Sequence, residues 1–551
     1  MDNNPKWLSE LEGTVPKAAY GISINVYAVA FEAWRRGLNV SFENGYSKSR
    51  GRHFIRYVIG NRQKRLKFTH NRSELVSQKA IRTASNKMAT RNLLAEKDIP
   101  AVRSAIIKTA DLKTIQSKTN EFNFPIRISM LASSSKNTRT ATADNREEVS
   151  EFIGKQKESS KTKGFLLEES AERTHYYAYI VDQEVIGVYK KETPYITGDG
   201  FKSIKELVEE VNAVRSRVPS ITNLEISVDK KLGNILKKQN YKMDSVPESG
   251  EQVAIKSESG SKEPVDVTDL FSDEMKNNLI KVIGALPGMI QGEVEFHYDQ
   301  DTEDYSIYAI NGRPGIRNYL YPIHGEARPI PKAIIDYYFP ETKGNYLSDT
   351  TPKYYFDYKC VNDELRNNRL SKIVVPKHRY EPNLVSKSIS FQSDYDLKKL
   401  KKMIKDNFIR LKFDGEFNVG DNNQFELIIV GNYQDAAYFY EYLQTKKYLD
   451  NIKTVDFDGG VGIGYTLNDL RTDKSETSVE LTKAADELLK TSEEAKAEKR
   501  KSLRQIRRYQ KKIRQRNDRI SALEQEIEDL KKSKSWKITA RVRKIRNKLG
   551  K

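Results

Sequence analysis

The chain has 551 residues, enough for two to four domains with buried cores, and its single cysteine, Cys360, excludes an internal disulfide and fits a reducing compartment. The first residues carry acids and a proline where a signal peptide needs an apolar core, and no apolar run near the start approaches the ~20 residues of a membrane span. The net charge of +19 is concentrated in residues 501–551, which hold 19 Lys and Arg against 5 Asp and Glu, so the nearly balanced remainder argues against a nucleic-acid-binding core. These features predict a cytoplasmic protein.

Residues 1–75 are expected to form a small α/β module. The apolar pattern that begins at Ala18 predicts a helix ending at Gly37, because glycine is typical of the position just after a helix. Alternation of apolar and polar residues then predicts strands at 38–42 and 54–59.

An expected β-hairpin at residues 292–311 is the most informative stretch. Its two arms alternate apolar and polar residues around an acidic turn, so Glu293 and Glu295 share one face of the first arm. A carboxylate of this face and Asn311 at the end of the second arm are oxygen ligands suited to Mg²⁺. The residues alone leave a simpler alternative open, an exposed acidic strand face followed by a Pro-Gly turn.

Two sequence blocks carry a family resemblance. Residues 197–212 read TGDGFKSIKELVEEVN, residues 311–315 read NGRPG, and the second block continues to a helix ending in DYYFP at 336–340. In this order and at this spacing they resemble the ATP-grasp domain of cyanophycin synthetase and of the bifunctional glutathione synthetases. The resemblance implies an ATP-grasp domain at 76–345, preceded by a pre-ATP-grasp-like module at 1–75.

The resemblance implies that ATP is bound by particular side chains. Lys87 matches a lysine that binds nucleotide phosphates, and Glu168 matches the carboxylate that accepts hydrogen bonds from ribose hydroxyls. Lys191 falls where the family has a basic residue before a proline, and it is either a phosphate or acyl-phosphate ligand or a solvated lysine. Ser129 stands where the family has a second phosphate-binding lysine. Arg127, two residues earlier on the same strand face, is the expected substitute.

The resemblance also implies Mg²⁺ as a cofactor. Glu295 and Asn311 match its ligands, whereas Ala309 stands where a bridging glutamate is expected, and Glu293 is the nearest carboxylate able to compensate. Arg313 is the expected stabiliser of a negatively charged intermediate.

Two further departures from the family pattern affect the phosphate end of this site. Tyr177 replaces an arginine, and the hydroxyl-rich residues 131–140 replace a glycine-rich loop whose backbone approaches phosphate closely. Such a loop either binds phosphate through its side chains or is a surface loop without a ligand, and the sequence leaves both open.

Residues 346–470 are expected to form a ferredoxin-like domain. The pattern predicts helices at 397–408 and 435–443 and strands at 409–413 and 425–430. FDGEFN, which begins at Phe413, and the strand that follows resemble the second half of acylphosphatase. The catalytic asparagine of that family falls on Val419, so a non-catalytic relative is expected.

The C-terminal region is expected to be a coiled coil at 471–533 followed by a basic amphipathic tail at 534–551. Apolar residues recur every seven positions along two seams, at Ile506, Ile513, Ile520 and Ile527 and at Leu523 and Leu530. Isoleucine at one seam and leucine at the other favours a parallel homodimer, and the alternative is a single solvated helix. The tail has the basic and apolar spacing that suits an anionic membrane surface, at the inner face of the membrane.

The sequence therefore predicts a mixed α/β protein with an ATP-grasp fold, a ferredoxin-like domain and a C-terminal coiled coil. The leading hypothesis is an ATP-dependent carboxylate-amine ligase that forms an amide through an acyl phosphate, and the tail alone suggests a bacterial cell-envelope or capsule substrate. The rival is a binding or scaffold protein on a degenerate ATP-grasp fold. A third hypothesis, nucleic-acid binding through the tail, is supported only by the positive charge of the tail.

Overall fold

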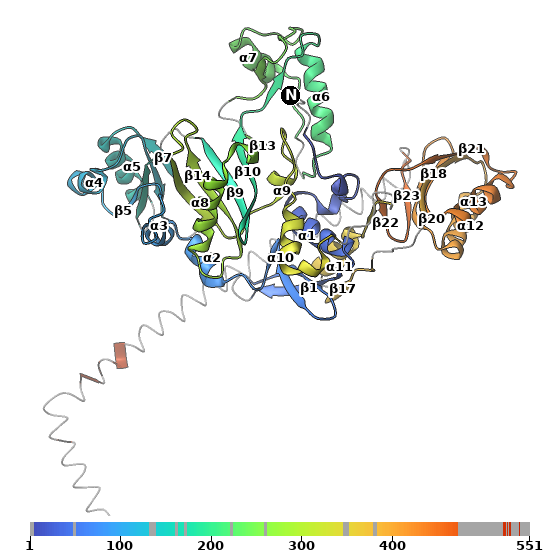
Figure 1. Ribbon diagram of the computed structural model, residues 1–551, viewed down its shortest axis with the longest axis horizontal. Coiled ribbons are helices and arrows are strands. Elements are labelled where there is room, and N and C mark those ends of the chain that lie inside the picture. Colours follow the sequence, from blue (N-terminus) through green and yellow to red (C-terminus); the bar gives the residue numbers. More distant parts are fainter. Residues whose placement is uncertain are drawn as a thin grey trace, which may run out of the picture. The chain divides into compact units, whose positions relative to one another are not determined.

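The computed structural model gives a mixed α/β architecture (Figure 1). The residues it describes are 5–47, 51–131, 139–159, 164–169, 174–220, 224–257, 262–344, 352–367, 369–377, 383–471, 522–524, 526, 528–529 and 539. They divide into two units, residues 1–469 and 470–551, and each unit is described by itself. The first unit contains all the helices and strands named below.

The N-terminal part of the chain forms one helix and an antiparallel sheet. Helix α1 spans Ile24–Arg35 and is followed by Gly37 in the left-handed region, at φ 77°, as predicted. It begins later than the predicted Ala18 because Gly21 also has a positive φ, 68°, which an α-helix cannot include. The sheet has the order β17-β1-β2-β3-β4. In chain order its strands are Asn39–Ser47, Arg52–Gly60, Arg65–Thr69, Arg72–Ser73 and, as β17, Lys372–Val374.

The core of this sheet is completed by residues far along the chain. Helices α10 (Ile330–Tyr338) and α11 (Tyr358–Arg366) pack on α1 and on strands β1 and β2, respectively. The ring of Phe356 lies between 5.1 and 6.5 Å from four aromatic rings of the N-terminal part. The expected boundary after residue 345 therefore does not separate two cores, because the aromatic residues that follow it are buried in the first one.

Two sheets form the middle of the first unit. The four-stranded sheet has the order β5-β8-β6-β7, and the five-stranded sheet has the order β13-β10-β9-β14-β15. The strands of the first are β5 Ser104–Ile107, β6 Ile126–Met130, β7 Thr140–Ala143 and β8 Phe165–Glu169. The strands of the second are β9 His175–Val181, β10 Glu184–Glu192, β13 Glu263–Asp266, β14 Gln291–Tyr298 and β15 Tyr305–Asn311.

Helices cover each of these sheets through apolar side chains. On the four-stranded sheet lie α4 (Leu112–Thr119) and α5 (Arg146–Ser159), which contribute Ile115, Val149 and Ile153 to its core. On the five-stranded sheet lie α2 (Gln78–Ala84), α3 (Lys87–Ala95) and α8 (Asp273–Gly284). Helix α3 also carries side chains that reach the four-stranded sheet, so it connects the two layers.

Strands β14 and β15 form the predicted hairpin. They pair antiparallel, with Glu293 opposite Asn311 and Glu295 opposite Ala309. Val294 and Phe296 are fully buried in the core. Glu293 and Glu295 alternate with them along the strand and therefore lie on its other face. The predicted alternation is confirmed for the first arm. The second arm has an irregularity at Tyr308, since Glu295 pairs with Ala309 and Phe296 with Ile307.

The block at 197–212 lies in a small lobe, in which β11 (Tyr195–Thr197) pairs with β12 (Gln252–Ala254). Helices α6 (Ile204–Ser216) and α7 (Lys230–Lys238) pack beside these strands (Figure 1). Gly198 lies against the backbone of residue 248, and an added Cβ would be 2.2 Å from the Glu248 carbonyl oxygen. Ser203 and Glu206 form a capping box that starts α6. The block therefore encodes a tight turn followed by a capped helix.

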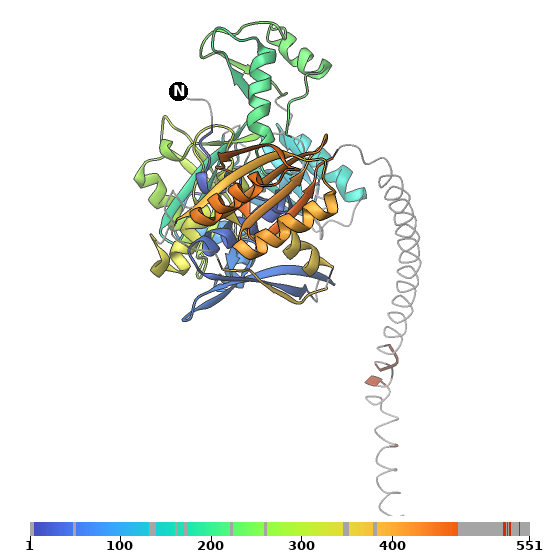
Figure 2. The same ribbon diagram turned by 90° about the vertical axis from the view of Figure 1, so that its right-hand side faces the viewer.

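Residues 384–469 form a separate five-stranded sheet with the order β21-β18-β20-β19-β23. Its elements in chain order are β18 Leu384–Gln392, α12 Leu397–Leu411, β19 Asp414–Val419, β20 Gln424–Asn432, α13 Tyr433–Gln444, β21 Asp450–Asp456 and β23 Tyr465–Asp469. The first six have the β-α-β-β-α-β order of ferredoxin-like folds. Figure 2 shows α12 and α13 on the same face of the sheet. The relationship to acylphosphatase stays a prediction.

The predicted strand at 409–413 is wrong, because helix α12 continues to Leu411. Ile409 lies in this helix with its side chain exposed, although its apolar side chain suggested a buried strand position. The helix ends at Lys412, which has a left-handed φ of 54°, and strand β19 begins only at Asp414.

Most of the expected coiled coil and tail, 471–551, lies outside the described residues. The few described positions between 522 and 539 are helical and exposed. None of the described helices combines the length and apolarity that crossing a bilayer requires.

Candidate functional site

Glu168 is the centre of a buried ion cluster between the two middle sheets. It lies on β8 and is fully buried. From helix α3, Lys87 Nζ donates to Oε1 at 2.8 Å and to Oε2 at 3.0 Å, and Arg91 Nη2 also donates to Oε1. The Tyr308 hydroxyl of β15 donates to Oε2 at 3.2 Å. Side chains from both sheets and from the connecting helix thus meet on one carboxylate.

Burial and charge in this cluster shift the pKa values of Glu168, Lys87 and Tyr308. Burial alone would raise the pKa of Glu168, but Lys87 and Arg91 outweigh it and hold the pKa below its ordinary value. Burial lowers the pKa of Lys87 although Glu168 opposes that change. Burial, followed by the Glu168 charge, raises the pKa of Tyr308 to about 12. Glu168 is therefore ionised and held by two cations and a hydroxyl.

Strand β6 brings Arg127 beside this cluster. Arg127 is the register partner of Glu168 across β6 and β8, and its charge contributes to the lowered pKa of Lys87. Ser129 is the partner of Leu166 and lies two residues further from Glu168. The structure thus brings Lys87, Arg127 and Glu168 together and leaves Ser129 at their edge.

The second carboxylate of the hairpin region, Glu293 on β14, has neutral hydrogen-bond donors. The Tyr319 hydroxyl donates to Oε2 at 2.8 Å, and the Asn311 amide donates to Oε1 at 3.3 Å. Burial raises the pKa of Glu293 to about 7, and the nearby charge of Glu295 contributes to the rise, whereas Lys191 opposes it. Glu293 is thus poised to change charge near neutral pH.

Glu295 lies on the same strand face but in a different electrostatic environment. His175 Nδ1 is 3.0 Å from Oε1, and His297 Nε2 is 3.0 Å from His175 Nε2. Burial would raise the pKa of Glu295, but the hydrogen bond and charge of His175, with Tyr177 and Lys87, hold it below its ordinary value. The ring of His175, which contacts Glu295, lies 5.0 Å from the ring of Tyr308, which contacts Glu168, so the two halves of the site adjoin.

The predicted phosphate ligand Lys191 lies next to the hairpin carboxylates. Its Nζ is 4.7 Å from the centre of the Tyr177 ring, and its charge lowers the pKa of Glu293. Tyr177 thus offers its ring face to the Lys191 ammonium group and supplies no charge of its own.

Arg313 lies at the end of the hairpin, beside Arg72 of strand β4. Its backbone N–H donates to Asn311 Oδ1 at 2.9 Å, and Arg72 Nη1 donates to the Gly312 carbonyl at 3.1 Å. Burial, followed by the charge of Arg313, lowers the pKa of Arg72. The predicted catalytic arginine is thus exposed at the end of the hairpin, and none of the contacts described for it involves Glu168.

Sequence reasoning did not identify Arg91, Tyr308, His175 or Tyr319, although all four contact a site carboxylate. A signal existed for Arg91, since it lies four residues after Lys87 and therefore on the same helix face. The other three depend on strand register and tertiary packing, which no local pattern reveals.

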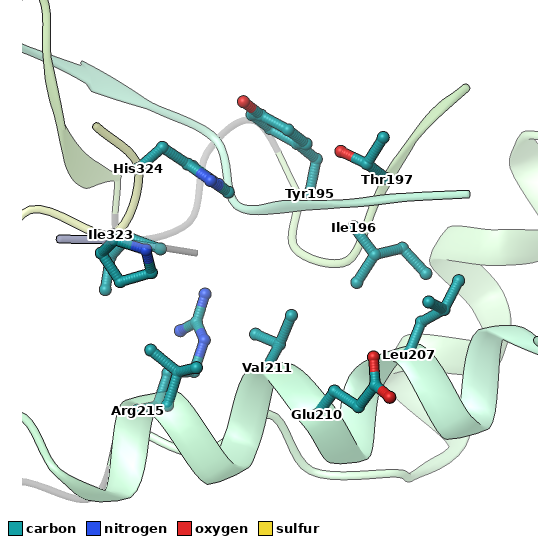
Figure 3. A pocket seen from close by; sticks show the side chains of 11 residues that line it. Tyr195, Ile196, Thr197, Leu207, Glu210, Val211, Arg215, Ile323 and His324 are labelled. Carbon is teal, nitrogen blue, oxygen red and sulfur yellow. The ribbon is translucent and has the colours of Figure 1, made fainter. Parts of the chain in front are cut away.

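A separate cavity of about 110 Å³ lies between helix α6 and strand β11 (Figure 3). The rings of Tyr195 and His324 stack at 4.7 Å on one side, and apolar side chains of α6 form the other. Arg215 lines the cavity and donates to both carboxylate oxygens of Glu263. None of the predicted site residues is among the described residues that line it.

Comparison with known proteins gives relatives for about half of the chain. No family model matches it. It is 23% identical over 300 residues to cyanophycin synthetase of Geminocystis herdmanii, covering 53% of this chain and 34% of that one. It is 29% identical over 187 residues to the glutathione biosynthesis bifunctional protein GshAB of Clostridium perfringens, covering 32% and 24% of the two chains. The chain thus spans about a third or less of these curated relatives' length.

These similarities support a relationship to the ATP-grasp superfamily. Among solved structures, a bifunctional glutathione synthetase from Pasteurella multocida matches with a TM-score of 0.42 and 18% identity, covering 52% of this chain and 40% of that one. ATP-grasp ligases use ATP and Mg²⁺.

The hairpin side chains fit Mg²⁺ in charge and ligand type. Within the described ranges, no group of three or more His, Cys, Asp or Glu is arranged to hold a metal ion. Mg²⁺ normally takes only one or two protein carboxylates, and substrate phosphates supply further ligands. Glu293 and Glu295 would supply the carboxylates. A cation there would favour the ionised form of buried Glu293. Asn311 would have to turn its amide, since its oxygen accepts the Arg313 N–H.

Proposed function

We propose that this protein is an ATP-dependent carboxylate-amine ligase that forms an amide through an acyl phosphate. The supporting observation is that Lys87, Arg127 and Glu168 converge beside the hairpin carboxylates. The two groups are linked through the rings of Tyr308 and His175, which lie 5.0 Å apart. ATP-grasp ligases form amide or peptide bonds, and the relatives named above are of this kind. In this proposal, Lys87 and Arg127 supply cations for the phosphates of ATP, and the adjoining strand β14 supplies carboxylates for the Mg²⁺ bound to these phosphates.

In the proposed reaction, the γ-phosphoryl group of ATP passes to a carboxylate oxygen, giving ADP and an acyl phosphate. An amine nitrogen then attacks the acyl carbon, the C–O bond to phosphate breaks, and the nitrogen loses a proton. Bound Mg²⁺ would supply charge neutralisation on the phosphates. Most of the acceleration would come from positioning and fixed charge.

The residues have distinct roles in this proposal. Lys87, Arg127 and Lys191 hold phosphate oxygens, and Glu168 accepts hydrogen bonds from the ribose. Glu295 and Asn311 are the proposed metal ligands, and Glu293, which contacts Asn311, is the nearest further carboxylate. Arg313 is placed to stabilise a negatively charged substrate at the end of the hairpin.

The direct test is calorimetric titration of the full chain with ATP, with and without Mg²⁺. The full chain is needed because residues 354–375 complete the N-terminal core. Metal-dependent binding is expected, and replacing Glu295 and Asn311 together by alanine should abolish the metal dependence. Glu303→Ala, in the exposed turn of the same hairpin, is the matched control and should bind like the wild type. Unchanged metal dependence in the double variant would contradict the metal assignment.

A second candidate function is a binding or scaffold protein on a degenerate ATP-grasp fold. It is favoured by the residues found at three family positions, Ser129, Tyr177 and Ala309. Absence of ATP binding in a folded full-length protein would select it. ADP release that depends on added carboxylates and amines would select the ligase.

The finer parts of the proposal concern partners and location. We expect a homodimer through the coiled coil at 471–533 and contact of the tail at 534–551 with an anionic membrane surface, in cell-envelope or capsule synthesis. Removal of residues 478–551 should convert a dimer into a monomer in light scattering. Co-sedimentation of the full chain with anionic but not neutral vesicles would support the membrane role, and salt-sensitive binding of duplex DNA instead would favour nucleic acid.

A further inference from the structure

The cluster around Glu168 contains more positive charge and more donors than its single carboxylate can satisfy. Lys87 and Arg91 bring two cations to one anion. Arg91 is 7% exposed, and its Nε and Nη1 atoms are buried without a hydrogen-bond partner in the part of the chain that the structure describes. A buried guanidinium with unpaired donors is costly, which indicates that the cluster is arranged for a further acceptor.

The two cations differ in their freedom to leave Glu168. The Lys87 side chain is 33% exposed, whereas that of Arg91 is 7% exposed. Arg91 Nη2 also donates to the Tyr308 carbonyl oxygen at 3.3 Å, which fixes it to strand β15. Lys87 Nζ has the Tyr308 ring as its second neighbour, at 4.1 Å. Lys87 is therefore the mobile partner and Arg91 the fixed one.

Lys87 also occupies both oxygens of the carboxylate that the proposed function gives to the ribose. A ribose hydroxyl needs a free carboxylate lone pair, and a phosphate needs a free ammonium group. The four contacts from Lys87, Arg91 and Tyr308 fill the roughly four lone-pair sites of the Glu168 carboxylate. Two of the three ammonium donors of Lys87 are held by the same carboxylate, so neither group is fully available while the two side chains are paired to each other. The pairing can be broken without leaving Glu168 as an isolated buried charge only because Arg91 remains bound to it.

We propose that Lys87 exchanges Glu168 for a nucleotide phosphate when ATP binds, and that Arg91 is a positioning residue that holds Glu168 for the ribose during this exchange. This inference rests on the proposed function, since it describes how the same site takes its nucleotide. The Lys87-Glu168 pair is then a contact of the ligand-free protein that competes with the nucleoside part of ATP.

The test compares ATP with adenosine, which has the ribose but no phosphate. Removing the ammonium group in Lys87→Met should weaken Mg·ATP binding by roughly tenfold or more, because a charged hydrogen bond to phosphate is lost. The same substitution should tighten adenosine binding several-fold, because Glu168 is released. Opposite changes for the two ligands are the signature, and a general loss of structure would weaken both. Lys97→Met, just after helix α3 and exposed, is the control and should change neither.

The Arg91 variants test the positioning role. Arg91→Gln should weaken adenosine and ATP by a similar factor, since both use the ribose contact, and Arg91→Lys should recover most of the loss by restoring a cation. Circular dichroism of each variant establishes that it is folded, and Arg91→Lys keeps the test informative where Arg91→Gln does not fold. Failure of the lysine variant to recover binding while folded would overturn the role of Arg91.

The two proposals fail in different ways. A folded wild-type protein that binds neither ligand would overturn the proposed function and the exchange with it. Wild-type binding of Mg·ATP, together with equal weakening of both ligands by Lys87→Met, would overturn the exchange and leave the nucleotide site in place.

Discussion

Glu168 and Glu293 are two buried carboxylates in adjoining halves of one site, and their pKa values are shifted in opposite directions. Both are less than a tenth exposed, and both accept a hydrogen bond from a tyrosine hydroxyl. Glu168 also contacts two cations, and its pKa is below the ordinary value. The direct donors to Glu293 are a hydroxyl and an amide, and its pKa is raised to about 7.

The comparison shows that the charge of the partner, more than burial or the number of hydrogen bonds, decides the protonation state here. Neutral donors offset part of the cost of burying a carboxylate, whereas a contacting cation outweighs it. The Glu168 half therefore needs no added cation, because Lys87 and Arg91 already neutralise its carboxylate. In the Glu293 half, the charge of Lys191 opposes the raised pKa of Glu293 without outweighing burial, so a divalent cation at the hairpin would supply the further counter-charge.

The largest expected effect is on the Glu168 half. Arg91→Met removes the less exposed of its two cations, and breaking a buried ion pair by removing one partner typically costs about 3–5 kcal/mol. We expect the free energy of unfolding in urea to fall by about 3 kcal/mol, because Lys87 still contacts Glu168. Lys155→Met breaks an exposed pair with Glu151 and should cause no measurable change. An equally small change in both variants would show that the cluster contributes little to stability.

The next effect is the pH dependence of the Glu293 half. The ordinary pKa of a glutamate is 4.5 and that of folded Glu293 is about 7, so between these values the folded protein binds the additional proton. Its contribution to stability is complete below pH 4.5 and is lost as the pH rises through about 7, a change of about 3 kcal/mol at most.

Glu293→Gln isolates this contribution, because the amide cannot ionise. We expect the wild type to lose stability relative to the variant between pH 5 and pH 8 when unfolding is measured in urea with EDTA, and Mg²⁺ to restore part of the loss at pH 8. Glu303→Gln in the exposed hairpin turn is the control. Parallel pH profiles of the wild type and Glu293→Gln would place the pKa of Glu293 at its ordinary value.

Much of the local structure could be predicted from the sequence, since it is set by short-range patterns. The hairpin follows from alternation, and the end of α1 follows from Gly37. The composition of the N-terminal core did not follow, because Phe356 packs on rings more than three hundred residues earlier and no local signal identifies such partners. The strand predicted at 409–413 failed because an exposed isoleucine near a helix end resembles a strand position.

The candidate site also has a part that could be predicted from the sequence and a part that could not. Family positions identified Lys87, Glu168, Glu295 and Asn311, but not which of them contact one another. The Asn311 amide donates to Glu293 and not to Glu295, because strand register places Asn311 opposite Glu293. The opposite pKa shifts of the carboxylates likewise depend on tertiary neighbours such as Arg91 and Tyr319, which come from helix α3 and from the segment after the hairpin.

The smallest expected effect separates the two carboxylates by their tyrosines. Tyr308→Phe removes a donor from Glu168, which is ionised throughout the neutral range, so we expect a loss of about 1–2 kcal/mol that is the same at pH 5.5 and pH 8. Tyr319→Phe removes a donor from Glu293, which carries its full charge only above about pH 7, so its loss should be larger at pH 8 than at pH 5.5. Urea unfolding of both variants at both pH values makes the comparison, and it cancels the shared cost of deleting one hydroxyl. A loss that grows with pH for Tyr308→Phe but not for Tyr319→Phe would reverse the assignment of which half of the site is already neutralised by the protein.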